Sequence, residues 1–454
     1  MTTGKKILLC CAASILAASA RPAAAEAPVR IVSISFHGNR TDESVLRNRL
    51  PVKEGDALRP WSLAAVRRSL YGLRLFKDVE VSSEAVSGGA GINVRLKDGD
   101  YLIPVPMLGG GSGGRRAGLA LFSRNLFRKA ESLTAAGFSG DNGGSLMFMG
   151  ALEGWSAQAF YSRGSGEEFH YADGAYTSAS MFRKTSDANA VAKFGAVADS
   201  YSRTSTRASF ALGFPLSPAS RDGGLTGRVG WQPGKTAYGD VTAGGSPSGG
   251  RDGQVFAELR AGARAGTFAD GIGALLGFGL ADLGERLKPL PRHVMALGGS
   301  LAFYRGDAWT GSDTAYSYAA ASGRWSLMWG ARNSLQFSAG LSGGRDLPPG
   351  RLVATGRELG LQGEYAREFR GQSGAGASVS YSRPLTVSFR GILQGGVFAE
   401  TAGAWGAGEG GSKRGAGAYL FYRFWRFPLP LGLSYTYSFD DSDSQITGAI
   451  GGRF

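Results

Sequence analysis

The sequence from Tyr101 to Phe454 consists of repeated short segments in which large apolar residues alternate with small or polar residues. In the clearest segment, one face of the expected strand holds Leu431, Leu433, Tyr435, Tyr437 and Phe439, and the other holds Gly432, Ser434, Thr436 and Ser438. The same alternation occurs at Trp155, Ala157, Ala159 and Tyr161, and at Phe210, Leu212 and Phe214. Large apolar side chains outside and small polar side chains inside are typical of a transmembrane antiparallel β-barrel with a wet interior. A soluble sandwich turns its large residues inward and exposes more charge, so the pattern favours the barrel.

The composition agrees with a mainly β chain and excludes other classes. Glycine accounts for 73 of the 454 residues, aromatic residues for 11 % and charged residues for only 19 %. A disordered chain would have more charge and fewer aromatic residues, and glycines without a three-residue period exclude collagen. The longest apolar stretch, Ile7 to Ala20, is too short to cross a bilayer as a helix.

The length of the alternating region predicts the number of strands. Residues 101–454 form the predicted barrel, and sixteen strands would give about 22 residues to each strand and its connection. That length suits tilted strands of about ten residues joined by alternating short and long loops. The segment from Arg426 to Pro430 suits a short turn, because its two prolines cannot pair in a closed ladder. Counting alone leaves fourteen or eighteen strands open.

Residues 1–25 have the pattern of a secretory signal peptide. Lys5 and Lys6 precede the apolar stretch, and Ala23 to Ala25 form a small-residue cleavage site. Both cysteines of the chain, Cys10 and Cys11, lie in this segment. The mature chain is therefore expected to have no disulfide, no thiolate metal site and no cysteine nucleophile.

The formal net charge of +14 raises the question of nucleic-acid binding. The basic residues are scattered singly, with no Lys/Arg-rich run or basic helix. We therefore expect no nucleic-acid partner. A polar, basic barrel lumen or an anionic lipid headgroup layer explains the charge better.

Residues 26–100 have a different pattern and predict a small α/β domain. The expected elements are a strand around Ile31 to Phe36, a helix capped by Thr41 or Asp42 that ends near Asn48, a helix over Pro60 to Tyr71, and strands Lys77 to Ser83 and Gly91 to Lys97. This order resembles a POTRA domain, the periplasmic module of the outer-membrane assembly-factor superfamily. The residues that carry the resemblance are Gly38-Asn39, Gly55-Asp56 and the run from Leu70 to Val79.

The alternating region resembles the barrels of the same superfamily, the BamA and TamA type and the two-partner secretion transporters. Ser123 to Phe127, Gly360 to Tyr365, Glu368 to Gly371 and Tyr381 to Leu385 carry this resemblance. In relatives a long loop with a "[V/L]-R-G-[Y/F]" motif folds into the lumen, and its arginine meets the acidic residue of an "F-x-D-x-G" strand.

Both key positions of these motifs depart from the family pattern. The loop motif is Leu361, Gln362, Gly363 and Tyr365, and the strand motif is Phe398, Glu400 and Gly403. Glutamine thus replaces the arginine and glutamate replaces the aspartate, which leaves at most one charge-assisted bond between the two side chains. The paired change suggests that the contact is retuned rather than lost. Arg357 or Arg367 could substitute for the missing arginine, or the segment could be a plain extracellular loop.

The two ends of the barrel are expected to meet at a seam. The first strand begins near Leu102 and contains Val105, and the last contains Gly448 and Ile450 and ends on Phe454. A terminal phenylalanine on an alternating strand resembles the β-signal of bacterial outer-membrane barrels. Prolines remove donors from the first strand and glycines add backbone entropy to both, so this ladder should be weak, as a gate requires. Alternatively, the glycines merely allow the barrel to close tightly.

The sequence holds no recognisable catalytic or cofactor motif. His37, His170 and His293 are each isolated from metal-ligand spacing, and nucleophile elbows, P-loops and paired-carboxylate signatures are missing. We therefore expect no enzyme activity, no cofactor and no metal site.

The resemblance implies a function in the outer membrane, with the POTRA domain in the periplasm. An edge strand of that domain, through Val79 and Val81, would capture client polypeptides by β-augmentation. The barrel would then insert the clients or pass them through, with outer-membrane lipids and accessory periplasmic proteins as further partners. The alternative is a passive channel or structural barrel with a vestigial POTRA domain.

Overall fold

The computed structural model describes residues 29–73, 75–99, 102–111, 114–140, 143–152, 155–178, 197–217, 224–239, 249–265, 294–330, 333–363, 365, 367–388, 391–406, 410–424 and 430–450. The predicted signal peptide lies outside these residues. The chain divides after Gly99 into two compact units. No helix among the described residues is long and apolar enough to cross a membrane.

The first unit is a three-stranded sheet with two helices. Its elements are β1 (Ile31–His37), α2 (Glu43–Arg47), α3 (Ser62–Gly72), β2 (Phe76–Val86) and β3 (Gly89–Asp98). The strand order is β1-β3-β2, with β1 parallel and β2 antiparallel to β3. This confirms the predicted β-α-α-β-β order. Asp42 precedes α2 as expected, but its side chain makes no capping hydrogen bond.

The core of this unit lies between α3 and the sheet. Val66 and Leu70 of α3 are fully buried, as are Val79 of β2 and Val94 of β3. The apolar stripe expected on the second helix is therefore the face that packs on the strands.

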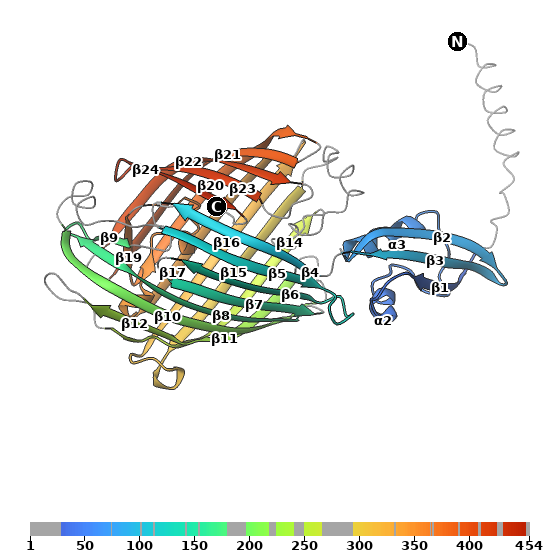
Figure 1. Cartoon of the computed structure of the whole chain (residues 1–454), viewed down its shortest axis with the longest axis horizontal. Helices are drawn as coiled ribbons and strands as arrows, with labels where there is room; N and C mark the ends of the chain where they lie inside the picture. The colour runs from blue at the N-terminus through green and yellow to red at the C-terminus, as the bar shows by residue number, and fades with distance from the viewer. Residues whose placement is uncertain are drawn as a thin grey trace, which may run out of the picture. The chain divides into compact units, whose positions relative to one another are not determined.

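The second unit is a closed antiparallel barrel (Figure 1). Its strands are β4 (Leu102–Gly111), β5 (Gly114–Arg124), β6 (Ser132–Gly140), β7 (Gly143–Leu152), β8 (Trp155–Tyr171), β10 (Val197–Pro215), β11 (Gly224–Gln232) continued by β12 (Gly234–Gly239), β14 (Gln254–Ala265), β15 (Val294–Gly306), β16 (Tyr316–Trp329), β17 (Asn333–Arg345), β20 (Ser373–Val387), β21 (Gly391–Trp405), β22 (Gly411–Phe424), β23 (Pro430–Ser438) and β24 (Asp443–Ile450). Pro233 separates β11 from β12, and both pair with β10, so we count them as one strand. Each strand pairs with the next, and β24 pairs with β4, which confirms the sixteen-stranded barrel.

Four short strands complete the sheet: β9 (Ala175–Ser178), β13 (Gly250–Arg251), β18 (Val353–Ala354) and β19 (Glu368–Gly371). They lie in the connections rather than in the wall. The predicted turn from Arg426 to Pro430 connects β22 to β23, but residues 425–429 lie outside the described part of the chain.

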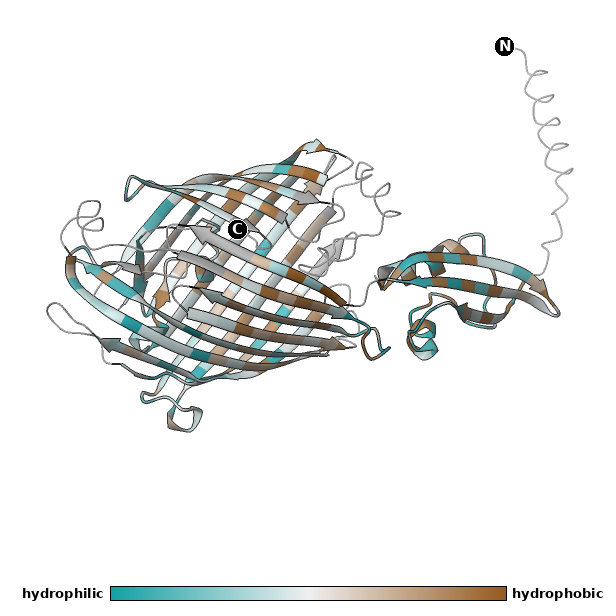
Figure 2. Ribbon diagram, viewed as in Figure 1, coloured by the Kyte–Doolittle hydropathy of each residue, from teal (hydrophilic) through white to brown (hydrophobic). Residues whose placement is uncertain are grey.

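The two faces of the wall follow the predicted alternation. On β23, Leu433 and Tyr435 are 50 % and 44 % exposed on the outside, whereas Thr436 and Ser438 are each 3 % exposed. Trp155 and Phe210 are exposed in the same way. Figure 2 shows apolar residues alternating with polar ones along the barrel strands. Large apolar residues therefore face outward, as a membrane-spanning barrel requires.

The inner face is not uniformly polar, and here the expectation of small polar residues was wrong. On β4 to β6, the buried residues Val105, Ala120 and Ala136 pack with partly buried Phe122 and Phe138. Apolar side chains thus meet on the inner side of the first strands, because each strand places an apolar residue at the same level of the wall.

Candidate functional site

The connection between β17 and β20, residues 346–372, folds against the inner wall of the barrel, and we call it the lumen loop. It contains two short helical turns, η3 (Pro349–Arg351) and η4 (Arg357–Leu359), as well as β18 and β19. Leu359 and Leu361 are 0 % and 4 % exposed and pack with Ala402 of β21. The segment is therefore not a plain extracellular loop.

Glu400 of β21 is the main attachment point of the lumen loop. Its carboxylate accepts hydrogen bonds from the backbone N–H of Gln362 at 2.6 Å, the backbone N–H of Gly363 at 2.9 Å and the hydroxyl of Tyr365 at 2.5 Å. Only 7 % of Glu400 is exposed. Three donors on a buried carboxylate form a strong, charge-assisted contact.

The side chain of Gln362 does not take part in this contact. Its Nε2 atom donates to the hydroxyls of Ser378 and Ser380 on β20, at 3.3 and 3.1 Å. The prediction that positions 362 and 400 meet is therefore correct, but the predicted bond between the two side chains is wrong. Backbone N–H groups of Gln362 and Gly363 make the contact with Glu400 instead.

The other motif residues have different surroundings. A Cβ atom on Gly363 would lie 2.7 Å from Oε1 of Glu400, so glycine allows the backbone to approach the carboxylate. The ring of Phe398 is 5 % exposed and lies over Gly417 of β22. Gly403 pairs with Ala375 and Ser412, and a Cβ atom there would meet Gly411 and Trp405 rather than the motif of the lumen loop.

Arg367 does not substitute at Glu400, because it forms a second attachment. It is 7 % exposed and makes ion pairs with Asp173 in the β8–β9 turn and Asp441 in the β23–β24 turn. Lys413 of β22, which is fully buried, also pairs with Asp441. The side chain of Arg357 lies outside the described part of the structure.

The Arg367 pair lowers the pKa of Asp173. Partial burial opposes ionisation of this carboxyl, but the hydrogen bonds from Arg367 and from the backbone N–H of Ala175 outweigh it and hold the pKa below its usual value. A lowered folded-state pKa stabilises the fold above the unfolded-state pKa, and this contribution is lost as the pH falls through the folded value. Strong acid should therefore weaken this attachment.

Two more arginines attach the lumen loop elsewhere on the wall. Arg370 pairs with Glu168 of β8 at 3.1 Å, and Arg203 of β10 pairs with the same carboxylate at 2.5 Å. Nε of Arg351 lies 3.2 Å from Asp252, which follows β13. The arginines of the lumen loop therefore hold it at three places around the barrel. The sequence analysis missed these contacts, although the high arginine content of residues 345–370 was a signal.

The seam between β24 and β4 closes the barrel. Gly448–Gly110 and Ala449–Gly109 pair there within the described residues, and residues 451–454, which follow on the last strand, lie outside that part of the chain. Phe454 is one of these four residues. The register places Ile450 opposite Leu108, so Val105 and Ile450 do not face each other, and the buried Val105 belongs to the apolar cluster inside the barrel.

The sheet of the first unit has two edges, and the edge at β1 is occupied. The backbone N–H of Ile31 donates to Asp56 O at 2.8 Å, and the Ile31 carbonyl accepts from the N–H of Gly55 at 2.7 Å. The N–H of Ile34 donates to the Glu54 carboxylate. An added strand would have to displace the 54–58 segment.

The edge at β2 is open over part of its length. The backbone N–H of Val79 points away from β3 and donates to Tyr71 Oη at 3.3 Å and to Asp78 Oδ1 at 2.9 Å. Because antiparallel strands alternate, the N–H groups of Val81 and Ser83 point to the same side. Within the described residues, these two groups have no hydrogen-bond partner. Of the two predicted edge residues, Val79 is therefore occupied and Val81 is open.

Comparison with known proteins gives one family match and several structural likenesses. Residues 29–99 match the POTRA family model, described as "Surface antigen variable number repeat". Comparison with curated protein sequences gives no match. The structure resembles BamA from Haemophilus ducreyi lacking POTRA domains 1–3, with 15 % identity, a TM-score of 0.54 and coverage of 93 % of this chain and 84 % of that one.

The structure also resembles CdiB from Escherichia coli and CdiB from Acinetobacter baumannii. Identity is 14 % and 13 %, and the TM-scores are 0.59 and 0.55. The alignments cover 93 % of this chain in both cases, and 76 % and 73 % of the CdiB chains. At this level of identity the likeness is one of fold. The chain therefore combines a domain that matches the POTRA family model with a barrel whose fold is similar to those of BamA and CdiB.

Proposed function

We propose that this protein lies in the bacterial outer membrane and helps other polypeptides into or across it. The observation that carries the proposal is the architecture, a domain that matches the POTRA family model followed by a barrel of the BamA and CdiB fold, whose first and last strands pair with each other at Gly448–Gly110. Unpaired N–H and C=O groups are costly in lipid, so an opened seam favours any strand that pairs with them. A client strand would supply the N–H and C=O groups that pair with those of the opened seam.

The POTRA domain, which we place in the periplasm, would present the client to the barrel. The open N–H groups of Val81 and Ser83 are suited to β-augmentation, in which an extended client adds a strand to the sheet. Such binding uses main-chain hydrogen bonds and therefore tolerates clients of different sequence.

The lumen loop would keep the barrel in shape while the seam opens. Its contacts with Glu400, Asp441 and Glu168 join β21, the β23–β24 turn and β8 through the interior. A barrel that loses its seam pairing retains these interior connections. No step of this mechanism requires a nucleotide, metal or other cofactor.

Replacing Val81 with proline tests client capture. Proline removes the open backbone donor, so client adducts formed by a photo-crosslinking residue at position 83 should fall severalfold. Val81→Thr keeps both the donor and the branched shape, and it should retain wild-type adducts. The measurement is crosslinking in cells that express the full chain.

Circular dichroism and heat-modifiable gel migration of the purified variants report whether they fold. A folded Val81→Pro protein that forms wild-type adducts would show that the β2 edge does not bind clients. Val79 is a poorer test site, because its side chain is fully buried and its N–H is already bonded.

A further inference from the structure

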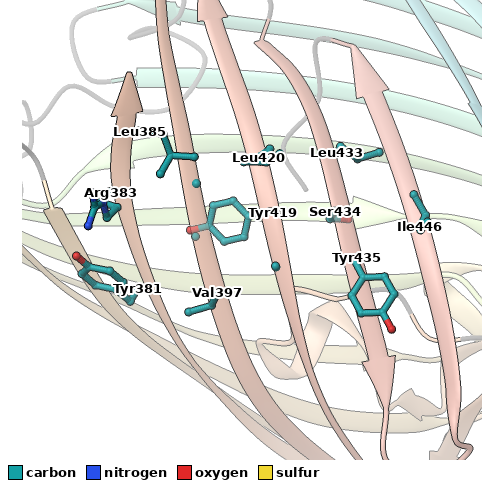
Figure 3. A pocket seen from close by; sticks show the side chains of 13 residues that line it. Tyr381, Arg383, Leu385, Val397, Tyr419, Leu420, Leu433, Ser434, Tyr435 and Ile446 are labelled. Atoms are coloured by element: carbon teal, nitrogen blue, oxygen red, sulfur yellow. The ribbon is translucent and has the colours of Figure 1, made fainter. Parts of the chain in front are cut away.

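An apolar groove crosses the outer face of the barrel on the strands that lead to the seam. It has a volume of about 520 Å³, and its lining on β20 to β24 is almost entirely apolar. Figure 3 shows its side chains spread over these neighbouring strands. This volume lies in the range of small-molecule sites, roughly 300–1,000 Å³.

The strand register explains why the groove forms. One row of cross-strand partners runs Arg383, Gly395, Leu420, Leu433 and Gly448, and the next runs Tyr381, Val397, Ala418, Tyr435 and Ile446. The small residues Gly395 and Ala418 leave a depression in the outer surface between larger neighbouring side chains. Leu385 lies over Gly395, since a Cβ atom there would be 2.8 Å from Leu385 Cδ1. The result is a slot of aliphatic and aromatic walls on the face that meets lipid.

One end of the groove holds a cation. Arg383 is exposed, and no ion pair with a carboxylate is found for it within the described part of the chain. The ladder of β17 with β20 ends at Ser334–Ser382, so Arg383 lies beside the start of β17, while β20 itself continues to Val387. Such a charge on the outer face of a barrel is favourable only near the headgroups.

Aromatic side chains mark the same level of the wall. The rings of Trp329 and Tyr381 are 6.2 Å apart, and the Tyr381 hydroxyl donates to Asn333 at 3.2 Å. Both Trp329 and Asn333 flank the β16–β17 turn. Tyrosine and tryptophan concentrate where the hydrocarbon core meets the headgroups. These rings support the inference that the Arg383 guanidinium reaches the headgroup level.

We propose that this groove binds one anionic phospholipid, with an acyl chain over Gly395 and Ala418 and the phosphate at Arg383. Apolar lining accounts for the acyl chain, and the exposed guanidinium of Arg383 accounts for the charge. The row through Gly395 ends at Gly448, which pairs with Gly110 across the seam. The groove itself extends as far as Ile446 on β24, the strand that pairs with β4 at the seam. The inference depends on the proposed function only in requiring a membrane, and it needs no client.

Native mass spectrometry of the full chain, released from detergent in the presence of dioleoylphosphatidylglycerol, tests this site. We expect one retained lipid, and weaker retention of dioleoylphosphatidylcholine, which has the same chains but no net charge. Arg383→Gln should reduce retention of the anionic lipid about fivefold, which corresponds to the ~1 kcal/mol contributed by one basic residue at a membrane surface. Arg305→Gln is the matched control, because Arg305 is an exposed arginine at the opposite end of the barrel, paired with Asp307.

Filling the groove tests the acyl-chain part separately. Ala418→Leu and Gly395→Leu each place a larger side chain on its floor and should lower retention of both lipids while Arg383 remains. Heat-modifiable gel migration shows which of the two variants folds. One folded variant is enough for this test. Equal retention of the two lipids by wild type, or an unchanged Arg383→Gln protein, would overturn the proposal. Because no client is present, neither result bears on client transport.

Discussion

Replacing Glu400 with alanine is expected to detach the lumen loop and destabilise the barrel strongly. The change removes the acceptor of three hydrogen bonds, from the N–H groups of Gln362 and Gly363 and from the Tyr365 hydroxyl. Each buried donor left without an acceptor costs about 1–3 kcal/mol, so the total loss should be roughly 3 kcal/mol or more. The measurement is the temperature at which the folded band disappears in a heat-modifiable gel.

Gln362→Ala is the matched control for this prediction. It deletes only the side-chain bonds to Ser378 and Ser380 and keeps the backbone donor to Glu400. Its cost should be about 1 kcal/mol, and Tyr365→Phe should fall between the two. If Gln362→Ala is as damaging as Glu400→Ala, the side chain rather than the backbone makes the contact.

A disulfide across the seam is expected to stop client assembly. Gly110 and Gly448 are direct antiparallel partners, and their strand geometry suits a disulfide between cysteines at these positions. The chain's own cysteines lie at positions 10 and 11, in the predicted signal peptide. Under oxidising conditions, assembly of client proteins should fall at least about tenfold, since the seam can no longer offer its backbone groups. A reductant should restore it.

A disulfide within an ordinary ladder separates this effect from rigidity in general. Ser434 and Thr447 are partners in the β23–β24 ladder, so Ser434→Cys with Thr447→Cys links two strands that need not part. This protein should assemble clients at the wild-type rate. Undiminished assembly by the protein crosslinked at positions 110 and 448 would contradict a lateral opening.

Most of the fold could be predicted because strands in a barrel wall have a strict two-residue period. The exposure of Leu433 and the burial of Thr436 follow directly from that period. The apolar cluster around Val105 could not be predicted from the period, because it forms only where neighbouring strands place apolar residues beside each other on the inner face of the barrel.

The candidate site could be predicted only in part. Resemblance to a family motif brought Gln362 and Glu400 together, but a motif does not state whether a side chain or a backbone N–H makes the bond. The attachments of Arg367 and Arg370 involve partners far away in the sequence, such as Glu168. The seam register depends on how the whole barrel closes, which no local pattern of residues around Val105 or Ile450 encodes.

The outer-membrane proteome of a deletion strain reports whether this protein acts on other polypeptides, as we propose. We expect a defined set of outer-membrane or surface proteins to be depleted after deletion. Wild-type protein should restore the set, and the protein crosslinked at positions 110 and 448 should not. An unchanged proteome, together with ion conductance of the purified barrel in planar bilayers, would instead show a passive channel.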